Sequence, residues 1–165
     1  MILLKNILVA TDFSEASDAA FEYGRELART FEAQLLVVHV TDNIMTPAFG
    51  GEGFVFADPD LQRDVEAAAD RRIDAMLCDE DRALLRARPV VLTSNAPASA
   101  IVDYASGHDI DLIVVGTHGR GGVAHVLMGS VAERVVRTAP CPVLTVRRPE
   151  HEFVLPDALA VAARA

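Results

Sequence analysis

Several residue types are scarce in this chain of 165 residues, which has no tryptophan, two tyrosines, two cysteines and a single lysine. Cys78 and Cys141 lie far apart without metal-ligand spacing around them, which excludes a disulfide scaffold or a cysteine-based metal site. No apolar run approaches the roughly 18 residues that a transmembrane helix requires. The first residues lack the basic segment and cleavage site of a secretion signal. We therefore expect a cytoplasmic protein without membrane insertion.

Basic residues are also in the minority, with 15 against 24 acidic residues and a net charge of -9. An acidic chain repels nucleic acid and anionic membranes at long range, so we expect no nucleic-acid partner. Apolar residues make up 51% and charged residues 24%, which is typical of globular proteins. The length suits one domain, which we expect over residues 1–148, followed by an alanine-rich tail over 149–165.

Short apolar runs alternate with amphipathic patterns along the chain. The predicted strands are residues 5–10, 34–40, 88–93, 111–116 and 143–146, and the predicted helices are 15–31, 59–77, 97–106 and 130–138. Ser14 is the expected N-cap of the first helix. The second predicted helix has a solvated charged face and an apolar packing stripe, which consists of Leu61, Val65, Ala69, Ile73, Met76 and Leu77. Buried strands alternating with helices predict an α/β fold, a doubly wound five-stranded parallel sheet with helices on both faces. The loop 46–58, rich in Gly and Phe, is open to several readings: a lid, a dimer contact, a docking site or a plain surface loop.

The carboxyl ends of the strands are where a doubly wound sheet binds its ligands. The loops to consider therefore follow the first, second and fourth predicted strands. They contain Thr11 and Asp12, residues 40–42, and the glycine-rich stretch 116–130. We expect the first and fourth strands to be neighbours at the point where strand order reverses.

The stretch 116–130 has the outline of a phosphate site. Glycines let backbone N–H groups approach an anion, and Gly129-Ser130 stands directly before a predicted helix whose N-terminus favours negative charge. Ser130 is either the N-cap of this helix or a phosphate ligand. Arg120 adds positive charge, as do His118 and His125 when protonated. No Gly-Lys-Ser/Thr sequence occurs, which excludes the lysine-bearing P-loop.

A second phosphate signature fits only formally. Residues 119–124 match the glycine pattern of the dinucleotide fingerprint. They follow the fourth predicted strand, however, and no acidic residue ends a later strand where a ribose would need one. The sequence therefore disfavours a dinucleotide site.

The spacing Gly116, two residues, Gly119, nine residues, Gly129-Ser130 resembles the nucleotide motif of the universal stress protein family. The segment KNILVATDFS at 5–14 resembles the opening strand and acidic loop of that family. Residues 35–40, 111–119, 130–135 and 141–144 resemble further family segments, so the resemblance covers roughly residues 4–148. It implies a Rossmann-like fold of the adenine nucleotide alpha hydrolase type.

The resemblance also implies a function, namely an ATP-binding domain that acts in stress responses, usually as a homodimer. It assigns Asp12 to the nucleoside, the Val40 backbone to adenine, and the glycines and Ser130 to ribose and phosphates. The expected site residues are Ala10, Thr11, Asp12, Val40, Gly116, Thr117, His118, Gly119, Arg120, Gly129, Ser130 and Val131. The last strand, from Val143 to Val146, is the expected dimer edge.

Three functions remain open on these observations. The first is a nucleotide-dependent sensing or signalling module that binds ATP, with or without Mg²⁺, and has an unidentified protein partner. The second is a weak ATPase or phosphotransferase at the same site, although no residue is seen to position a nucleophile, and Asp12 and Asp42 are candidates only for an indirect magnesium contact. The third is a nucleotide-free interaction dimer in which the glycine-rich loop is merely a turn.

Overall fold

The computed structural model describes residues 2–44, 59–117 and 128–147, and every structural statement below refers to these ranges. The loop 46–58, the segment from His118 to His125 and the tail 149–165, on which the sequence analysis made predictions, lie outside them. The elements in chain order are β1 (Asn6–Ala10), α1 (Glu15–Phe31), β2 (Gln34–Thr41), α2 (Pro59–Met76), α3 (Asp79–Leu84), β3 (Arg88–Thr93), α4 (Pro97–Gly107), β4 (Leu112–Gly116), α5 (Ser130–Thr138) and β5 (Val143–Val146).

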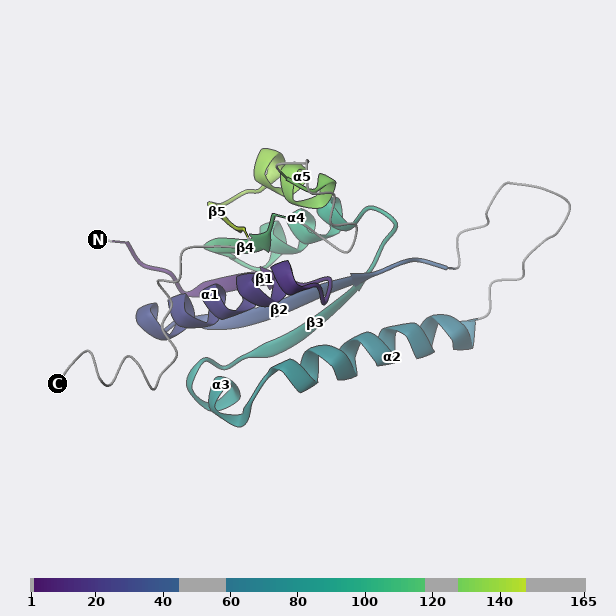
Figure 1. The fold of residues 1–165 in the computed structure, drawn as a ribbon, viewed down its shortest axis with the longest axis horizontal. Coiled ribbons are helices and arrows are strands. Elements are labelled where there is room, and N and C mark those ends of the chain that lie inside the picture. Colours follow the sequence, from purple (N-terminus) through teal and green to yellow (C-terminus); the bar gives the residue numbers. More distant parts are fainter. Residues whose placement is uncertain (1, 45–58, 118–127, 148–165) are drawn as a thin grey trace, which may run out of the picture.

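The strands of the described residues form one five-stranded sheet in the order β3-β2-β1-β4-β5, and each neighbouring pair is parallel (Figure 1). Strand order reverses at β1, which pairs with β2 on one side and with β4 on the other. The predicted doubly wound α/β fold is therefore confirmed. The predicted adjacency of the first and fourth strands is confirmed as well.

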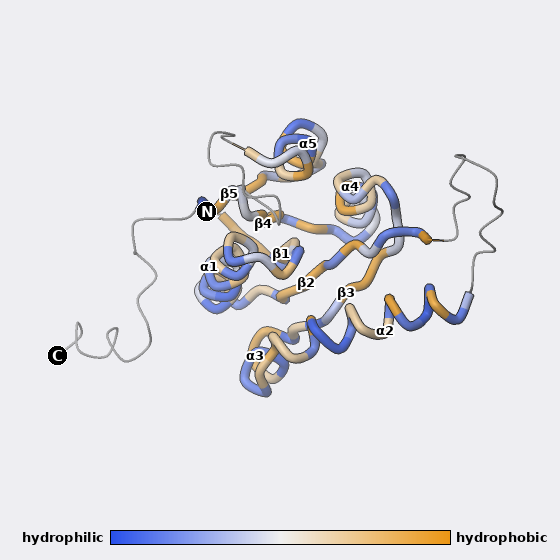
Figure 2. The backbone as a smooth tube through the Cα atoms, turned by 45° about the vertical axis from the view of Figure 1, so that its right-hand side comes forward, coloured by the Kyte–Doolittle hydropathy of each residue, from blue (hydrophilic) through white to orange (hydrophobic). Residues whose placement is uncertain are grey.

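The two faces of the sheet are covered by different helices, and alternate residues of β1 point to opposite faces. Ile7 and Val9 pack in the cluster that contains the buried side chains of α1 and α2, whereas Leu8 packs with those of α4 and α5. All three side chains are fully buried. The part of a strand that is buried on both faces must be apolar, which explains the apolar run from Ile7 to Ala10 in β1 (Figure 2).

The start of α1 is fixed by hydrogen bonds within the chain's own loop. Ser14 is the N-cap, as predicted, and its hydroxyl accepts from the Ser17 N–H while the Ser17 hydroxyl accepts from the Ser14 N–H. This capping box satisfies backbone donors that the helix itself leaves unpaired. It also holds the preceding residues of the β1–α1 corner in place.

Some local predictions were wrong. Of the two roles considered for Ser130, the N-cap is excluded, because Gly129 occupies that position and Ser130 is the first residue of α5. The helix α3 was not predicted, since its six residues are too few to show a helical period. Leu61, expected on the apolar stripe of α2, has 53% of its surface exposed. The fourth strand begins at Leu112, one residue later than predicted, and the Asp111 carboxylate accepts from the backbone N–H groups of Lys5 and Asn6.

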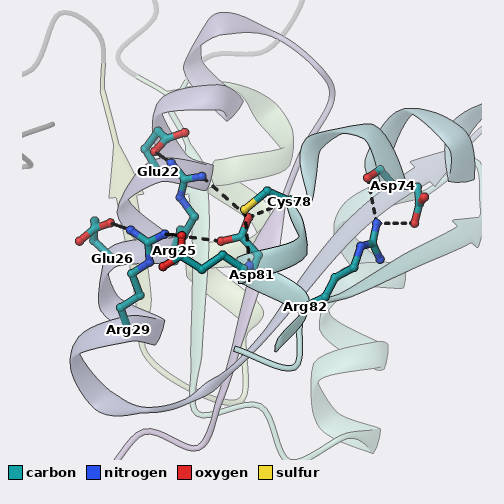
Figure 3. A network of polar contacts seen from close by, with 9 residues as sticks. Glu22, Arg25, Glu26, Arg29, Asp74, Cys78, Asp81 and Arg82 are labelled. Carbon is teal, nitrogen blue, oxygen red and sulfur yellow. Dashed lines mark hydrogen bonds and ion pairs between the residues drawn. The ribbon is translucent and has the colours of Figure 1, made fainter. Parts of the chain in front are cut away.

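A buried carboxylate ties α3 to α1 (Figure 3). Asp81 is fully buried, and its carboxylate oxygens lie 3.8 Å from Arg25 and 3.9 Å from Arg29. The same carboxylate accepts from the Cys78 N–H at 3.2 Å, and the Cys78 thiol accepts from the Asp81 N–H at 3.5 Å. This network anchors the segment that leads into the edge strand β3. Within the described residues, none of the helices has the length and apolarity needed to cross a bilayer.

Candidate functional site

A cleft of about 860 Å³ opens at the carboxyl ends of β1, β2 and β4. Strand order reverses between β1 and β4. The loop that follows β1 runs to one face of the sheet and the loop that follows β4 runs to the other, which leaves a crevice between the two loops. The volume is within the range of roughly 300–1,000 Å³ found for small-molecule sites. The cleft is also lined by residues of α2 and by the first residues of α4 and α5.

The β1–α1 corner forms one wall. The Thr11 side chain is buried, lies 3.1 Å from the Ser17 hydroxyl and accepts a hydrogen bond from the Phe13 N–H at 3.0 Å. Asp12 Oδ1 accepts from the Ser14 N–H at 3.1 Å and from the Ser14 hydroxyl at 2.6 Å. The Asp12 carboxylate is thereby held at the cleft by the start of α1.

The end of β2 presents backbone polar groups to the cleft. The Val38 carbonyl accepts from the Thr11 N–H, so Val38 points its backbone groups towards β1, whereas the Thr41 carbonyl accepts from the Ser94 N–H on the other side. Backbone groups alternate in direction along a strand, so those of Val40 point the same way as those of Val38. The last β1–β2 pair is Ala10 with Val38. The Val40 N–H and carbonyl therefore face the cleft beyond the end of β1.

The opposite wall is formed where β4 leads towards α5. The Gly129 N–H donates to the Thr117 carbonyl at 2.6 Å, and the Thr117 N–H donates to the Val146 carbonyl at 2.8 Å. The first of these bonds joins two residues near the opposite ends of the glycine-rich stretch. Ser130 and Val131, the first two residues of α5, line the cleft. The N–H groups of a first helical turn have no intrahelical acceptor and carry partial positive charge.

Gly116 has a structural explanation that the sequence analysis missed. A Cβ atom at this position would lie 2.7 Å from the Ala16 carbonyl oxygen and 2.8 Å from its carbonyl carbon. The backbone of α1 packs directly against β4 here, so packing alone requires glycine. The first glycine of the motif is therefore no independent evidence for a ligand.

The structure adds a wall from α2, which the sequence analysis read as a packing stripe with a solvated charged face. Its cleft-lining residues are Val65, Ala68, Ala69 and Arg72. Periodicity identified Val65 and Ala69 as apolar positions on one face, but no sequence signal indicated that this face extends beyond the sheet into a cleft.

Polar contacts attach this part of α2 to the strand ends. Gln62 accepts from the Ile44 N–H and donates to Glu66, whose carboxylate also accepts from the Thr93 hydroxyl at 2.7 Å. The hydrogen bond from Thr93, and then that from Gln62, lowers the pKa of Glu66 below its usual range, because both stabilise the ionised carboxylate. The α2 wall is thus fixed to β3 at its carboxyl end.

Comparison with known proteins places this chain. The sequence model of the universal stress protein family matches residues 4–147. The chain belongs to the universal stress protein family. A universal stress protein from Thermus aquaticus, named for its position 3′ of a QAH/OAS sulfhydrylase, is 38% identical over 149 residues, which are 88% of this chain and 100% of that protein.

Solved structures agree with the family assignment. The universal stress protein UspA from Lactobacillus plantarum has a TM-score of 0.69 and 30% identity, covering 89% of this chain and 100% of that one. A universal stress protein solved in complex with cAMP has a TM-score of 0.58 and 24% identity, covering 88% of this chain and 98% of that one, a likeness that shows the fold.

Most of the predicted site residues of this universal stress protein lie in the described ranges and meet at the cleft. His118, Gly119 and Arg120 lie outside those ranges. In the residues that the structure describes, no group of three or more His, Cys, Asp and Glu side chains is arranged to hold a metal ion. The predicted residues that line the cleft are Ala10, Thr11, Asp12, Val40, Gly116, Thr117, Gly129, Ser130 and Val131.

Proposed function

We propose that this universal stress protein binds an adenine nucleotide, ATP in the first place, and acts as a nucleotide-dependent sensing or signalling module. One observation carries the proposal. The cleft at the reversal of strand order combines outward backbone groups at Val40 with the N-terminus of α5. The edge of a base needs backbone donors and acceptors such as those of Val40, and a phosphate needs N–H donors such as those at the N-terminus of α5.

The cleft residues fit the parts of such a ligand. The Val40 N–H and carbonyl form a donor–acceptor pair that suits the N1 and amino edge of adenine. The α5 N-terminus suits phosphate oxygens. Asp12 suits ribose hydroxyls, because an ionised carboxylate accepts hydrogen bonds. A structurally similar universal stress protein has been solved with cAMP, which is itself an adenine nucleotide and supports this choice.

The proposal includes a magnesium ion that binds together with the nucleotide. Asp12 and Asp42 both line the cleft. Magnesium in nucleotide sites is commonly held by one or two carboxylates together with the phosphates and water. A magnesium-dependent gain in ATP affinity is the expected consequence.

The first experiment identifies the ligand. The purified protein is denatured, any released nucleotide is separated by chromatography, and the stripped protein is titrated with ATP, ADP and GTP with and without Mg²⁺ by calorimetry. We expect a micromolar dissociation constant for ATP, about -8 kcal/mol, and weaker GTP binding. Phosphate release measured in the same samples detects the ATPase alternative. Absence of released nucleotide and of heat with all three ligands would refute the proposal and favour a nucleotide-free dimer.

An isosteric pair of variants tests the placement of the phosphates. Ser130→Glu puts a negative charge in the first turn of α5, where it favours the helix but repels phosphate. Ser130→Gln has nearly the same shape and no charge. We expect S130E to keep the fold and lose ATP binding by at least about tenfold relative to S130Q. Equal ATP affinity in the two variants would contradict phosphate binding at α5.

The proposed module is a homodimer that pairs through β5. This strand ends the sheet in the described residues, with Val143, Leu144 and Thr145 half-buried. An edge strand offers unpaired backbone groups to another chain. Its protein partner is unidentified, and nucleotide occupancy is the signal that the dimer would present to it.

A further inference from the structure

Arg72 of α2 lies over the aromatic ring of Phe13, with its guanidinium carbon 3.9 Å from the ring centroid. The two residues come from elements far apart in the sequence, and both line the cleft. A guanidinium at this distance from a ring is attracted by its negative face. The contact therefore places a cation at the wall of the proposed nucleotide site.

The ring beneath Arg72 is held in position. Phe13 has a φ of 62°, a left-handed conformation in which the Thr11 hydroxyl accepts from its N–H at 3.0 Å. Its ring also contacts His39, with centroids 4.4 Å apart, and the His39 Nδ1 donates to the Thr11 carbonyl at 2.7 Å. Arg72 contacts Phe13, and Phe13 contacts His39, while hydrogen bonds to Thr11 hold both rings in place.

Among the described residues, Arg72 differs from most arginines on the neighbouring helices in forming no ion pair. Arg25, Arg29, Arg63 and Arg82 each have a carboxylate within 4.0 Å. A cation–π contact uses the charge of a guanidinium and leaves its N–H groups able to donate hydrogen bonds. Arg72 is therefore held against Phe13 and retains donors for a further partner.

The charges around Arg72 indicate what that partner is. The carboxylate-bearing residues of the described cleft wall are Asp12 and Asp42, and Arg72 supplies the permanent positive charge in the same wall. A polyphosphate must be balanced by cations, and guanidinium groups bind phosphate oxygens in a bidentate manner. Among the lining residues that the structure describes, Arg72 is the permanent side-chain cation available to an anion in this cleft.

We propose that Arg72, held over the ring of Phe13, is a phosphate-binding residue that makes the cleft favour nucleotides over nucleosides. The assignment rests on the proposed adenine-nucleotide function and adds α2 as a second source of phosphate contacts besides α5. Phe13 acts as a positioning residue, because it fixes the guanidinium without contacting the ligand's phosphates.

The test compares three ligands that share a base and differ in phosphate: ATP, AMP and adenosine. Each is titrated by calorimetry into the wild type, Arg72→Gln and Arg71→Gln. Arg71 is the matched control, because it is the adjacent exposed arginine of α2 and does not line the cleft. Circular dichroism and urea unfolding check that all three proteins keep the same fold.

The expected result is a loss that depends on phosphate. Charge-assisted hydrogen bonds predict that R72Q weakens ATP binding by about 10- to 100-fold, AMP binding less, and adenosine binding by less than about twofold. R71Q should bind all three like the wild type. ATP binding by R72Q should also depend less on salt. Phe13→Leu, which removes the aromatic face at the same backbone angle, should give an intermediate loss for ATP.

Two results would overturn the role of Arg72 alone. One is an ATP affinity in R72Q equal to that of the wild type. The other is an equal loss of affinity for adenosine and for ATP, which would mean that Arg72 supports the binding of the base, or the fold, instead of the phosphates. A wild-type protein that binds none of the three ligands would refute the nucleotide proposal itself, and the assignment of Arg72 with it.

Discussion

At the scale of single residues, Gly116 illustrates how one position serves packing and the candidate site together. The motif spacing predicted a glycine that lets backbone approach an anion. In the structure the space that a side chain would need is taken by the Ala16 carbonyl of α1. A substitution at Gly116 therefore changes stability before it reports on any ligand.

We predict that Gly116→Ala destabilises the protein by about 1–3 kcal/mol, because the new Cβ must displace backbone atoms. Gly107→Ala is the matched control, since nothing lies within 4 Å of a Cβ at that position and it ends α4. Alanine there should be neutral or stabilising by up to about 1 kcal/mol. Urea unfolding measures both, and equal stability of the two variants would contradict the packing explanation.

A second residue-scale prediction concerns Glu66. Its pKa is lowered by the hydrogen bonds from Thr93 and Gln62, so its ionised form stabilises the fold above its ordinary pKa near 4.5. That contribution is lost as the pH falls through the lower pKa of the folded state. Glu66→Gln should therefore lower the urea midpoint at pH 7, and the difference from wild type should shrink as the pH falls below about 4.5. A difference that is constant with pH would refute this.

At the scale of elements, α3 shows how a short helix is held by tertiary contacts. Six residues are marginal as an isolated helix, because nucleation is costly. Asp81 compensates by capping the helix at Cys78 and by pairing with Arg25 and Arg29 of α1 (Figure 3). The helix thus depends on α1 for its place.

We expect Asp81→Ala to destabilise the protein by about 2–3 kcal/mol. The value lies below the usual range for a broken buried pair, because the ion-pair distances are long and both arginines are partly exposed. Asp74→Ala removes the exposed pair with Arg82 and should cost less than about 1 kcal/mol. The comparison is made by urea unfolding, and a loss for D74A as large as for D81A would contradict the buried anchor.

At the scale of the whole molecule, the two edge strands of the sheet, β3 and β5, differ in the backbone groups that they offer to a second chain. β3 carries Pro89, which lacks a backbone donor. The carbonyl of Pro142, just before β5, accepts from Ile113 of β4, and that of Val146, in β5, accepts from Thr117. Val143 and Thr145 therefore point their backbone groups away from β4. β5 is thus the edge at which a second copy of the chain is expected to pair.

Thr145→Pro removes one of these outward N–H groups and spares the β4–β5 bonds. We predict that it shifts the proposed dimer towards monomer in light scattering coupled to size-exclusion chromatography, with an unchanged circular dichroism spectrum. Arg88→Ala, on the opposite edge strand, should leave the mass unchanged. A T145P protein that remains dimeric would contradict pairing through β5.

By itself the sequence determined the strands, four of the helices, the α/β class and the edge at which a ligand would bind. It could do so because apolar runs and helical periods are local, and because parallel connections fix strand direction. The assignment of a single domain over 1–148 and of the tail stays a prediction.

Only the tertiary structure decided which side chains line the cleft together and which contacts hold them there. Arg71 and Arg72 are both exposed charges on α2, and the linear sequence does not separate them. What distinguishes Arg72 is Phe13, held at a left-handed φ beneath it by a different segment of the chain. The packing against α1 that requires Gly116 is likewise non-local. Contacts between distant segments depend on how helices cross a sheet, and a linear pattern does not encode these distances.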